Sequence, residues 1–245
     1  MKSCPAKICL LLVCSSMTGC ASGDGNVWLE AGLGFLTSTN TQGQPAASEI
    51  GQAFKEALSI GSGNVVKQLA KADGYNADKS VHIALPGELA TVKTMLGKVG
   101  LSGMTDDLEL RLNRAAEAAA DEVQPIFMQA IREMTFEDVI AIYKGPDDSA
   151  TKYFQSKMSP ALAQKMRPIV SEQLSKIGAL QALDSVMAKY RAIPFVPDVN
   201  ADLTDYAVQK GMDGIFFYMA REEAAIRKDP VRQTSALLKR VFGAR

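Results

Sequence analysis

The only histidine of the chain, His82, is the first residue whose type suggests chemistry. Histidine changes protonation near neutral pH and serves as a general base or as a member of a catalytic triad. His82 lies between Val81 and Ile83 in an alternating stretch, where a histidine more often packs in a loop or faces solvent. All four cysteines lie within the first 20 residues, so the rest of the chain lacks the ligands for a zinc site or an HExxH protease.

Two short polar segments have some character of an ion-binding loop. Asp73-Gly74-Tyr75-Asn76-Ala77-Asp78 faintly resembles a calcium loop but lacks the alternating oxygen ligands and the closing glutamate, so we predict a polar turn. Gly61-Ser62-Gly63-Asn64 precedes an expected helix and could hold an anion on free amides. It lacks the lysine and the spacing of a phosphate loop, and we predict a turn between two helices.

Two pairs of adjacent carboxylates could be read as acid–base pairs. Asp147 and Asp148 follow a lysine, but adjacent residues do not face one site, and aspartate is common at the start of a helix. Glu222 and Glu223 lie near arginines on an expected helix, and we predict that they belong to its solvated face. Neither pair therefore indicates catalysis.

The segment from Arg221 to the C-terminus is rich in basic residues, with seven of them against three acidic ones. Such a segment could contact anionic lipid headgroups, where each basic residue contributes about 1 kcal/mol. A solvated helix face has the same composition and is the alternative. We accordingly predict no catalytic residue, no metal ligand and no cofactor.

The first 19 residues read as a targeting signal. Lys2 and Lys7 give a positive start, and the apolar run Ile8–Val13 is far shorter than a membrane-spanning helix. Met17-Thr18-Gly19-Cys20 then resembles a bacterial lipobox. We predict that residues 1–19 are a lipoprotein signal peptide and that Cys20 is the lipidated first residue of the mature chain; the alternative is a plain secretory signal cut near Ala21.

Lipidation of Cys20 would place the protein in the cell envelope. Acyl chains contribute about 0.8 kcal/mol per buried methylene, so several of them anchor a protein without a spanning helix. By resemblance to lipoproteins of enteric-type bacteria, the absence of aspartate after Cys20 implies the outer membrane, facing the periplasm, with the inner membrane as the alternative. Without Lys2 and Lys7, 25 basic residues stand against 27 acidic ones, which argues against a nucleic-acid partner.

Residues 20–45 are expected to be a flexible tether because they are rich in glycine and polar residues. An apolar island from Val27 to Leu36 interrupts the tether and contains the only tryptophan, Trp28. The island is either an interfacial anchor on the membrane or a short helix docked on the domain.

From Ala46 on, apolar residues recur at helical spacing almost throughout, and no low-complexity linker divides the rest of the chain. We predict one all-α domain over residues 46–245, with no significant sheet and an extended segment at Val81–Gly87. About nine or ten helices are expected. Pro125 should either kink or divide its helix, and Pro168 should kink another. The expected helices cover residues 48–60, 63–69, 88–99, 105–134, 135–143, 147–158, 159–177, 180–190, 202–228 and 230–242.

Two helix starts follow from capping residues, and one helix should be central. Thr105 is expected to cap the helix that follows it, and Ser159-Pro160 reads as a cap with proline at the first helical position. The helix to Lys228 is apolar on more than one side and is therefore expected to be buried.

Several stretches resemble a bacterial family of lipoproteins catalogued as domain of unknown function 4197. The stretch MTFEDVIAIYKGPDDSATKYF, residues 134–154, is the most specific. The other matching stretches are residues 56–64, 81–87, 105–120, 159–170, 194–230 and 237–243. The resemblance implies a helical envelope lipoprotein and brings no catalytic residues.

The leading expectation is a non-enzymatic envelope protein that binds a partner protein or organises envelope material. The alternative is a carrier of a lipid or another hydrophobic ligand, with methionines and four aromatic residues lining a cavity. Those aromatic residues are Tyr206, Phe216, Phe217 and Tyr218. A carboxylate-dependent enzyme is the third and weakest possibility.

Overall fold

The computed structural model describes residues 45–135, 137 and 139–243, and over these residues the protein is all-α, as predicted. No strand occurs among them, and eight α-helices replace the nine or ten expected. The elements are α2 (Ala47–Leu69), the 3₁₀ helix η1 (Gly87–Leu89), α3 (Ala90–Lys98), α4 (Ser102–Glu133), α5 (Val139–Lys144), α6 (Ser149–Ile177), α7 (Ala179–Arg191), α8 (Leu203–Lys228) and α9 (Ala236–Phe242). Cys20 and the apolar island Val27–Leu36 lie outside the described residues.

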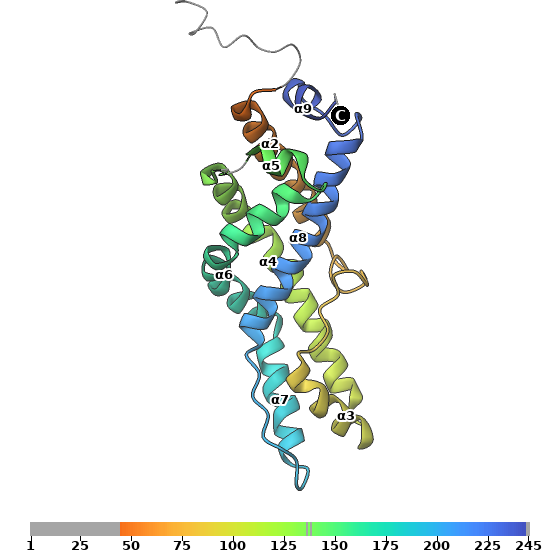
Figure 1. Cartoon of the computed structure of the whole chain (residues 1–245). Helices are drawn as coiled ribbons and strands as arrows, with labels where there is room; N and C mark the ends of the chain where they lie inside the picture. Colours follow the sequence, from red (N-terminus) through yellow and green to blue (C-terminus); the bar gives the residue numbers. More distant parts are fainter. Residues whose placement is uncertain (1–44, 136, 138, 244–245) are drawn as a thin grey trace, which may run out of the picture. The chain divides into compact units, whose positions relative to one another are not determined.

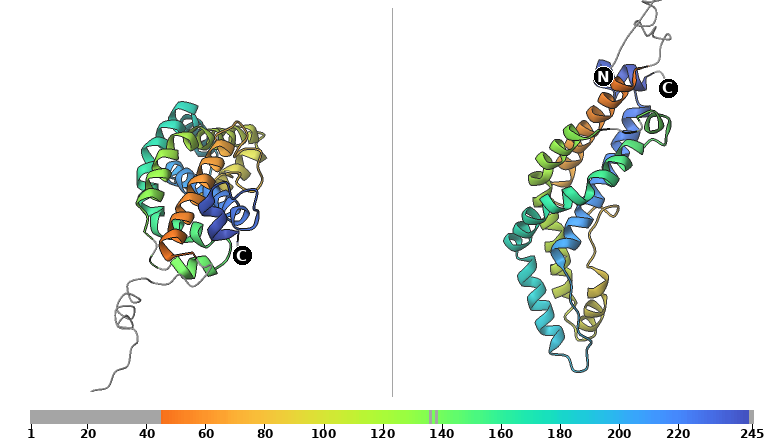
Figure 2. Two further views of the ribbon diagram at one scale, coloured as in Figure 1. Left: turned by 90° about the horizontal axis from the view of Figure 1, so that it is seen from above. Right: turned by 60° about the vertical axis from the view of Figure 1, so that its left-hand side comes forward.

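Four long helices, α2, α4, α6 and α8, enclose the core (Figure 1). Residues from Pro45 on form one compact unit whose buried core comes from residues 50–242, so this segment has a complete core of its own. Figure 1 and the right-hand view of Figure 2 place α3 and α7 at one end of the unit and α9 with the start of α2 at the other. None of the described helices is long and apolar enough to cross a membrane.

Three phenylalanines join α4, α6 and α8 at the centre of the core. The ring centroid of Phe127 lies 6.2 Å from that of Phe154 and 5.7 Å from that of Phe216, and the third pair is 5.9 Å apart. These tilted and edge-on arrangements are the ones that aromatic rings prefer. The expectation that α8 is buried on several sides is confirmed by its many buried residues.

The predicted turn at Gly61–Asn64 is wrong, because α2 runs without interruption from Ala47 to Leu69. Gly61 faces α8 instead of ending the helix: a Cβ at this position would lie 3.4 Å from Cβ of Glu222. The glycine thus permits the close approach of two helices. Since the amides of Gly61–Asn64 lie inside a helix, they are not a loop that could hold an anion.

The expected start at Ser159-Pro160 is also wrong, because α6 continues through Pro160 and Pro168. Pro160 has no N–H for the carbonyl of Ser156, which would normally favour a break. The hydroxyl of Ser159 donates to the carbonyl of Gln155 at 2.7 Å, and α6 buries residues on both sides of Pro160 against α4 and α8. Packing therefore outweighs the lost hydrogen bond, and the merged helices at α2 and α6 account for the lower helix count.

The start of α4 differs from the prediction in a smaller way. The helix begins at Ser102, and Thr105 lies buried in its first turn, with its hydroxyl donating to the carbonyl of Ser102 at 2.7 Å. Thr105 is therefore not the cap. The predicted apolar stripe from Leu108 onward is buried as expected, and α4 continues past Pro125 to Glu133.

Candidate functional site

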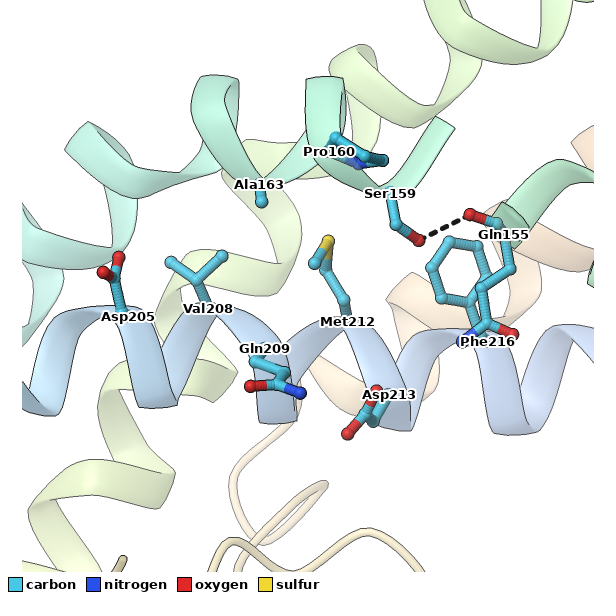
Figure 3. Close-up of a pocket in the computed structure, with 10 residues that line it drawn as sticks. All are labelled: Gln155, Ser159, Pro160, Ala163, Asp205, Val208, Gln209, Met212, Asp213 and Phe216. Atoms are coloured by element: carbon cyan, nitrogen blue, oxygen red, sulfur yellow. Dashed lines mark hydrogen bonds between the residues drawn. The ribbon is translucent and has the colours of Figure 1, made fainter. Parts of the chain in front are cut away.

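An open groove of about 440 Å³ lies between α6 and α8 (Figure 3). Small side chains on α6, from Ser159 to Ala163, face larger apolar ones on α8. Polar residues stand at its ends and along its outer edge, where Gln209 and Asp213 point away from α6 (Figure 3). The lining residues are Gln155, Ser159, Pro160 and Ala163 of α6 and Asp205, Val208, Gln209, Met212, Asp213 and Phe216 of α8.

Helical spacing creates this groove. Val208, Met212 and Phe216 recur every four residues and form one buried row on α8. Opposite this row, Pro160 and Ala163 have small side chains and leave a groove with an apolar floor. The floor side chains themselves are only slightly exposed, at 3% for Val208, 7% for Met212 and 4% for Phe216.

The charged groups that line the groove are both carboxylates. Asp205 pairs with Arg167, and Asp213 accepts from Lys210 at 3.2 Å on the same helix. Asp202 accepts from the backbone N–H of Asp205 at 3.0 Å, and this bond, with Arg167 nearby, holds the pKa of the Asp202 carboxyl below its usual value. Asp205 and Asp213 therefore both serve as acceptors in ion pairs at the edge of the groove. The hydroxyl of Ser159 faces a carbonyl instead of a base, so it is not activated as a nucleophile.

The four aromatic residues proposed to line a ligand cavity do not converge. Phe216 packs in the phenylalanine cluster of the core, and Phe217 lies 42% exposed beneath Arg221. The hydroxyls of Tyr206 and Tyr218 donate to the carbonyl of Ala84 and to a carboxylate oxygen of Asp78. The enclosed apolar pocket between α4, α6 and α8 has a volume of about 10 Å³, which leaves no room for a lipid chain.

His82 packs in a loop, which is one of the two ordinary roles expected for it. Its Nδ1 lies 2.9 Å from the carbonyl oxygen of Asn76, and its Nε2 lies 3.0 Å from Oε1 of Glu109 on α4. Burial alone would raise the pKa of Glu109, but hydrogen bonds from His82, Lys93 and the N–H of Leu85 hold that pKa below its usual value. The ionised carboxylate therefore stabilises the fold at neutral pH, and this contribution is lost as acid protonates it.

A row of polar residues on α4 binds the long loop that precedes η1. Asn113 accepts from the N–H of Ile83 at 2.9 Å and donates to the carbonyl of the same residue at 2.8 Å. Glu117 accepts from the N–H groups of Tyr75 and Asn76, both at 3.1 Å. Glu109, Asn113 and Glu117 recur every four positions and therefore share one face of α4. This polar spacing is visible in the sequence, but the helix is predicted only from the apolar stripe next to it. The row therefore positions the loop against α4.

The predicted polar turn at Asp73–Asp78 contains one buried aromatic side chain, that of Tyr75. Its ring is buried beneath α8, and its hydroxyl donates to the carbonyl of Gly211 at 2.8 Å. Burial raises the pKa of this phenol. A Cβ on Gly214 would lie 2.7 Å from the Tyr75 ring, so glycine is required where α8 crosses the tyrosine.

Glu223 is buried, which corrects the expectation of a solvated face. It accepts from the N–H groups of Ala150 and Thr151 at 3.0 and 2.7 Å, at the start of α6. Arg227 donates to it from Nη2 at 2.6 Å and also to the carbonyls of Ile142 and Tyr143, both at 3.3 Å. The Glu223–Arg227 pair thus ties α8 to the α5–α6 turn.

The remaining charged candidates form separate ion pairs. Asp147 pairs with Lys228, while Asp148 accepts from Lys152 at 2.8 Å, so the two neighbours do not share a site. Asp73 accepts a hydrogen bond from Arg114 at 2.8 Å, whereas Asp78 accepts one from Tyr218. The two carboxylates therefore have different partners and do not form a shared ion-binding loop. Within the described part of the chain, no group of three or more histidine, cysteine, aspartate or glutamate residues is placed to hold a metal ion.

The basic C-terminal segment is not a uniform solvated face. Arg227 is buried, whereas Arg232 and Arg240 are exposed and pair with Glu222 at 3.3 Å and Glu49 at 2.6 Å. Arg232 and Arg240 therefore connect the segment to α8 and α2 through these ion pairs. Exposed pairs of this kind contribute about 0–1 kcal/mol each.

The fold and the groove define an all-α protein with an open groove between two long helices in the described part of the chain. The chain belongs to the family described as protein of unknown function (DUF4197), whose family model matches residues 44–243. The resemblance inferred from the sequence stretches is thereby confirmed. Searches of curated proteins and of solved structures found no match.

Proposed function

We propose that this protein is a lipid-anchored envelope protein that binds a segment of a partner protein in the α6–α8 groove. The groove itself supports the proposal, because it combines an apolar floor with an edge whose ionisable lining residues, Asp205 and Asp213, are both acidic. A complementary segment carries an apolar side chain for the floor and a lysine or arginine beside it. The exposed Lys210–Asp213 pair is weak enough to exchange for such a partner.

Blocking the groove should abolish partner binding. Ala163→Phe places a ring over the apolar floor between Pro160 and Met212, so we expect at least a tenfold loss of partner capture, since 1.4 kcal/mol changes an equilibrium tenfold. The measurement is photo-crosslinking in intact cells from a probe at Gln209, followed by mass spectrometry of the crosslinked partner. Ala161→Phe is the matched control, because Ala161 is exposed on the same helix and does not line the groove.

Two results would contradict the groove as the binding site. One is an identical crosslinked partner from a probe at Gln68, an exposed position on α2 that does not line the groove. The other is unchanged crosslinking in Ala163→Phe. A stoichiometric lipid in an organic extract of the domain from Ala46, absent from a helical control protein, would favour the carrier function instead.

Lipidation of Cys20 is a separate part of the proposal. Cys20→Ser should abolish incorporation of labelled fatty acid and release the protein from the membrane fraction, because the acyl chains supply the anchoring free energy. Cys14→Ser, inside the predicted signal peptide, should leave labelling unchanged. Labelled Cys20→Ser protein would show that the lipid is attached elsewhere and would leave the groove hypothesis intact.

A further inference from the structure

The link between α7 and α8 carries an aromatic side chain that is fully exposed. Its apolar segment is Ile193-Pro194-Phe195-Val196-Pro197, which we name the tip. The relative exposure of Phe195 is 105%, compared with 84% for Val231, the next most exposed of the large apolar residues described. A phenylalanine left in water forgoes a large hydrophobic gain, so such complete exposure requires a reason.

The backbone holds Phe195 in this position. Its φ is +61°, a conformation that bulky residues rarely adopt. Pro194 and Pro197 restrict the chain on either side, and the buried Tyr190 donates its hydroxyl hydrogen to the carbonyl of Pro197 at 2.9 Å. Ile193 and Val196 lie partly buried against the core. The tip is thus a rigid turn that presents one ring outward, and strain of this kind points to a functional role.

Basic side chains gather at the same end of the unit. Lys189 and Arg191 lie in the last turn of α7, and Lys98 lies in the last turn of α3, which packs on α7. All three are exposed, and none takes part in an ion pair with another described residue. The α7–α8 link and α3 lie together at this end in two views (Figures 1 and 2). Asp198 is the acidic residue that follows the tip.

We propose that the tip, with Lys98, Lys189 and Arg191, inserts into the interface of a bilayer that contains anionic lipids. A lipid surface accepts a single protruding ring without a matching pocket, and basic side chains around that ring are attracted to anionic headgroups. The attraction is screened by salt. The partner groove and the membrane contact are therefore different surfaces of this protein.

A tryptophan reporter tests the insertion directly. The domain comprising residues 45–245 lacks Trp28, so Phe195→Trp introduces its sole tryptophan. With vesicles of phosphatidylglycerol and phosphatidylcholine, we expect its emission to shift to shorter wavelength and to be quenched by brominated acyl chains. Val231→Trp is the matched control: Val231 is also apolar and largely exposed, but it lies in the α8–α9 link, and the emission of a tryptophan there should not change.

The strength of vesicle binding tests the contributions of the Phe195 ring and of the basic side chains separately. Phe195→Ser should weaken vesicle binding by about tenfold, the effect expected for removing one inserted apolar side chain, whereas Val231→Ser should not. Serine at Lys98, Lys189 and Arg191 together should remove both the preference for anionic vesicles and the salt dependence. Circular dichroism checks that each variant is folded.

Three results would overturn the proposal. The first is equal quenching at positions 195 and 231, and the second is vesicle binding that is unaffected by Phe195→Ser. The third is a blue shift of Phe195→Trp that appears without vesicles as protein concentration rises, which would identify the tip as a contact between copies of the chain.

Discussion

Arg227→Met is expected to lower the free energy of unfolding by about 3–5 kcal/mol, because it leaves the buried carboxylate of Glu223 without its counter-charge. The guanidinium also packs between two rings, with its Cζ 4.8 Å from the ring centroid of Phe54 and 5.7 Å from that of Phe242. Its loss therefore loosens contacts between α8, α2 and α9 as well. Urea unfolding followed by circular dichroism gives the measurement.

Two further variants test this explanation. The double variant Glu223→Gln, Arg227→Met should recover part of the lost stability, because it removes the uncompensated charge while keeping a hydrogen-bonding group at the start of α6. Lys176→Met, which breaks an exposed pair with Glu172 at 2.7 Å, should change stability by less than about 1 kcal/mol. An equally small effect of Arg227→Met would show that the buried pair is dispensable.

Asn113→Leu should lower the free energy of unfolding by about 2–6 kcal/mol. Leucine has a similar size, but it leaves the N–H and the carbonyl of Ile83 buried without partners, at about 1–3 kcal/mol for each group. Hydrogen exchange should increase mainly in residues 70–86, because these form the loop that Asn113 holds against α4.

The matched control for this prediction is Asn64→Leu. Asn64 lies on the exposed side of α2 and donates to Glu222 at 3.2 Å in contact with solvent, so its replacement should cost less than about 0.5 kcal/mol. Uniform exchange throughout the domain in Asn113→Leu would indicate global unfolding and would contradict a local role of Asn113 in the loop.

The apolar periodicity was enough to predict the all-α fold, the stripe of α4 and the central position of α8. These features depend on the spacing of side chains along one helix. The two false breaks have a common cause. Gly61 and Pro160 carry strong local signals for helix ends, but their neighbours pack on helices that lie far away in the sequence, and this packing decides the outcome.

The charged residues were harder to predict for the same reason. Nothing near Glu223 in the sequence shows that its carboxylate meets the start of α6, which lies 72 residues away. Helical spacing alone cannot distinguish a solvated acidic face from a buried one when the partner is distant. The groove could not be predicted from the sequence, because small residues on α6 leave a groove only if the side chains of α8 pack opposite them.

The contact of Tyr75 with Gly211 spans 136 residues, and it has a consequence for the order in which the protein is made. A ribosome releases α2, the loop at residues 70–86 and α4 long before α8. Until α8 and α9 emerge, the ring of Tyr75 remains uncovered, and Phe54 of α2 lacks the neighbours that bury it. The core therefore cannot be completed before the C-terminal helices are made, so we expect the native state to form only after synthesis of α8 and α9.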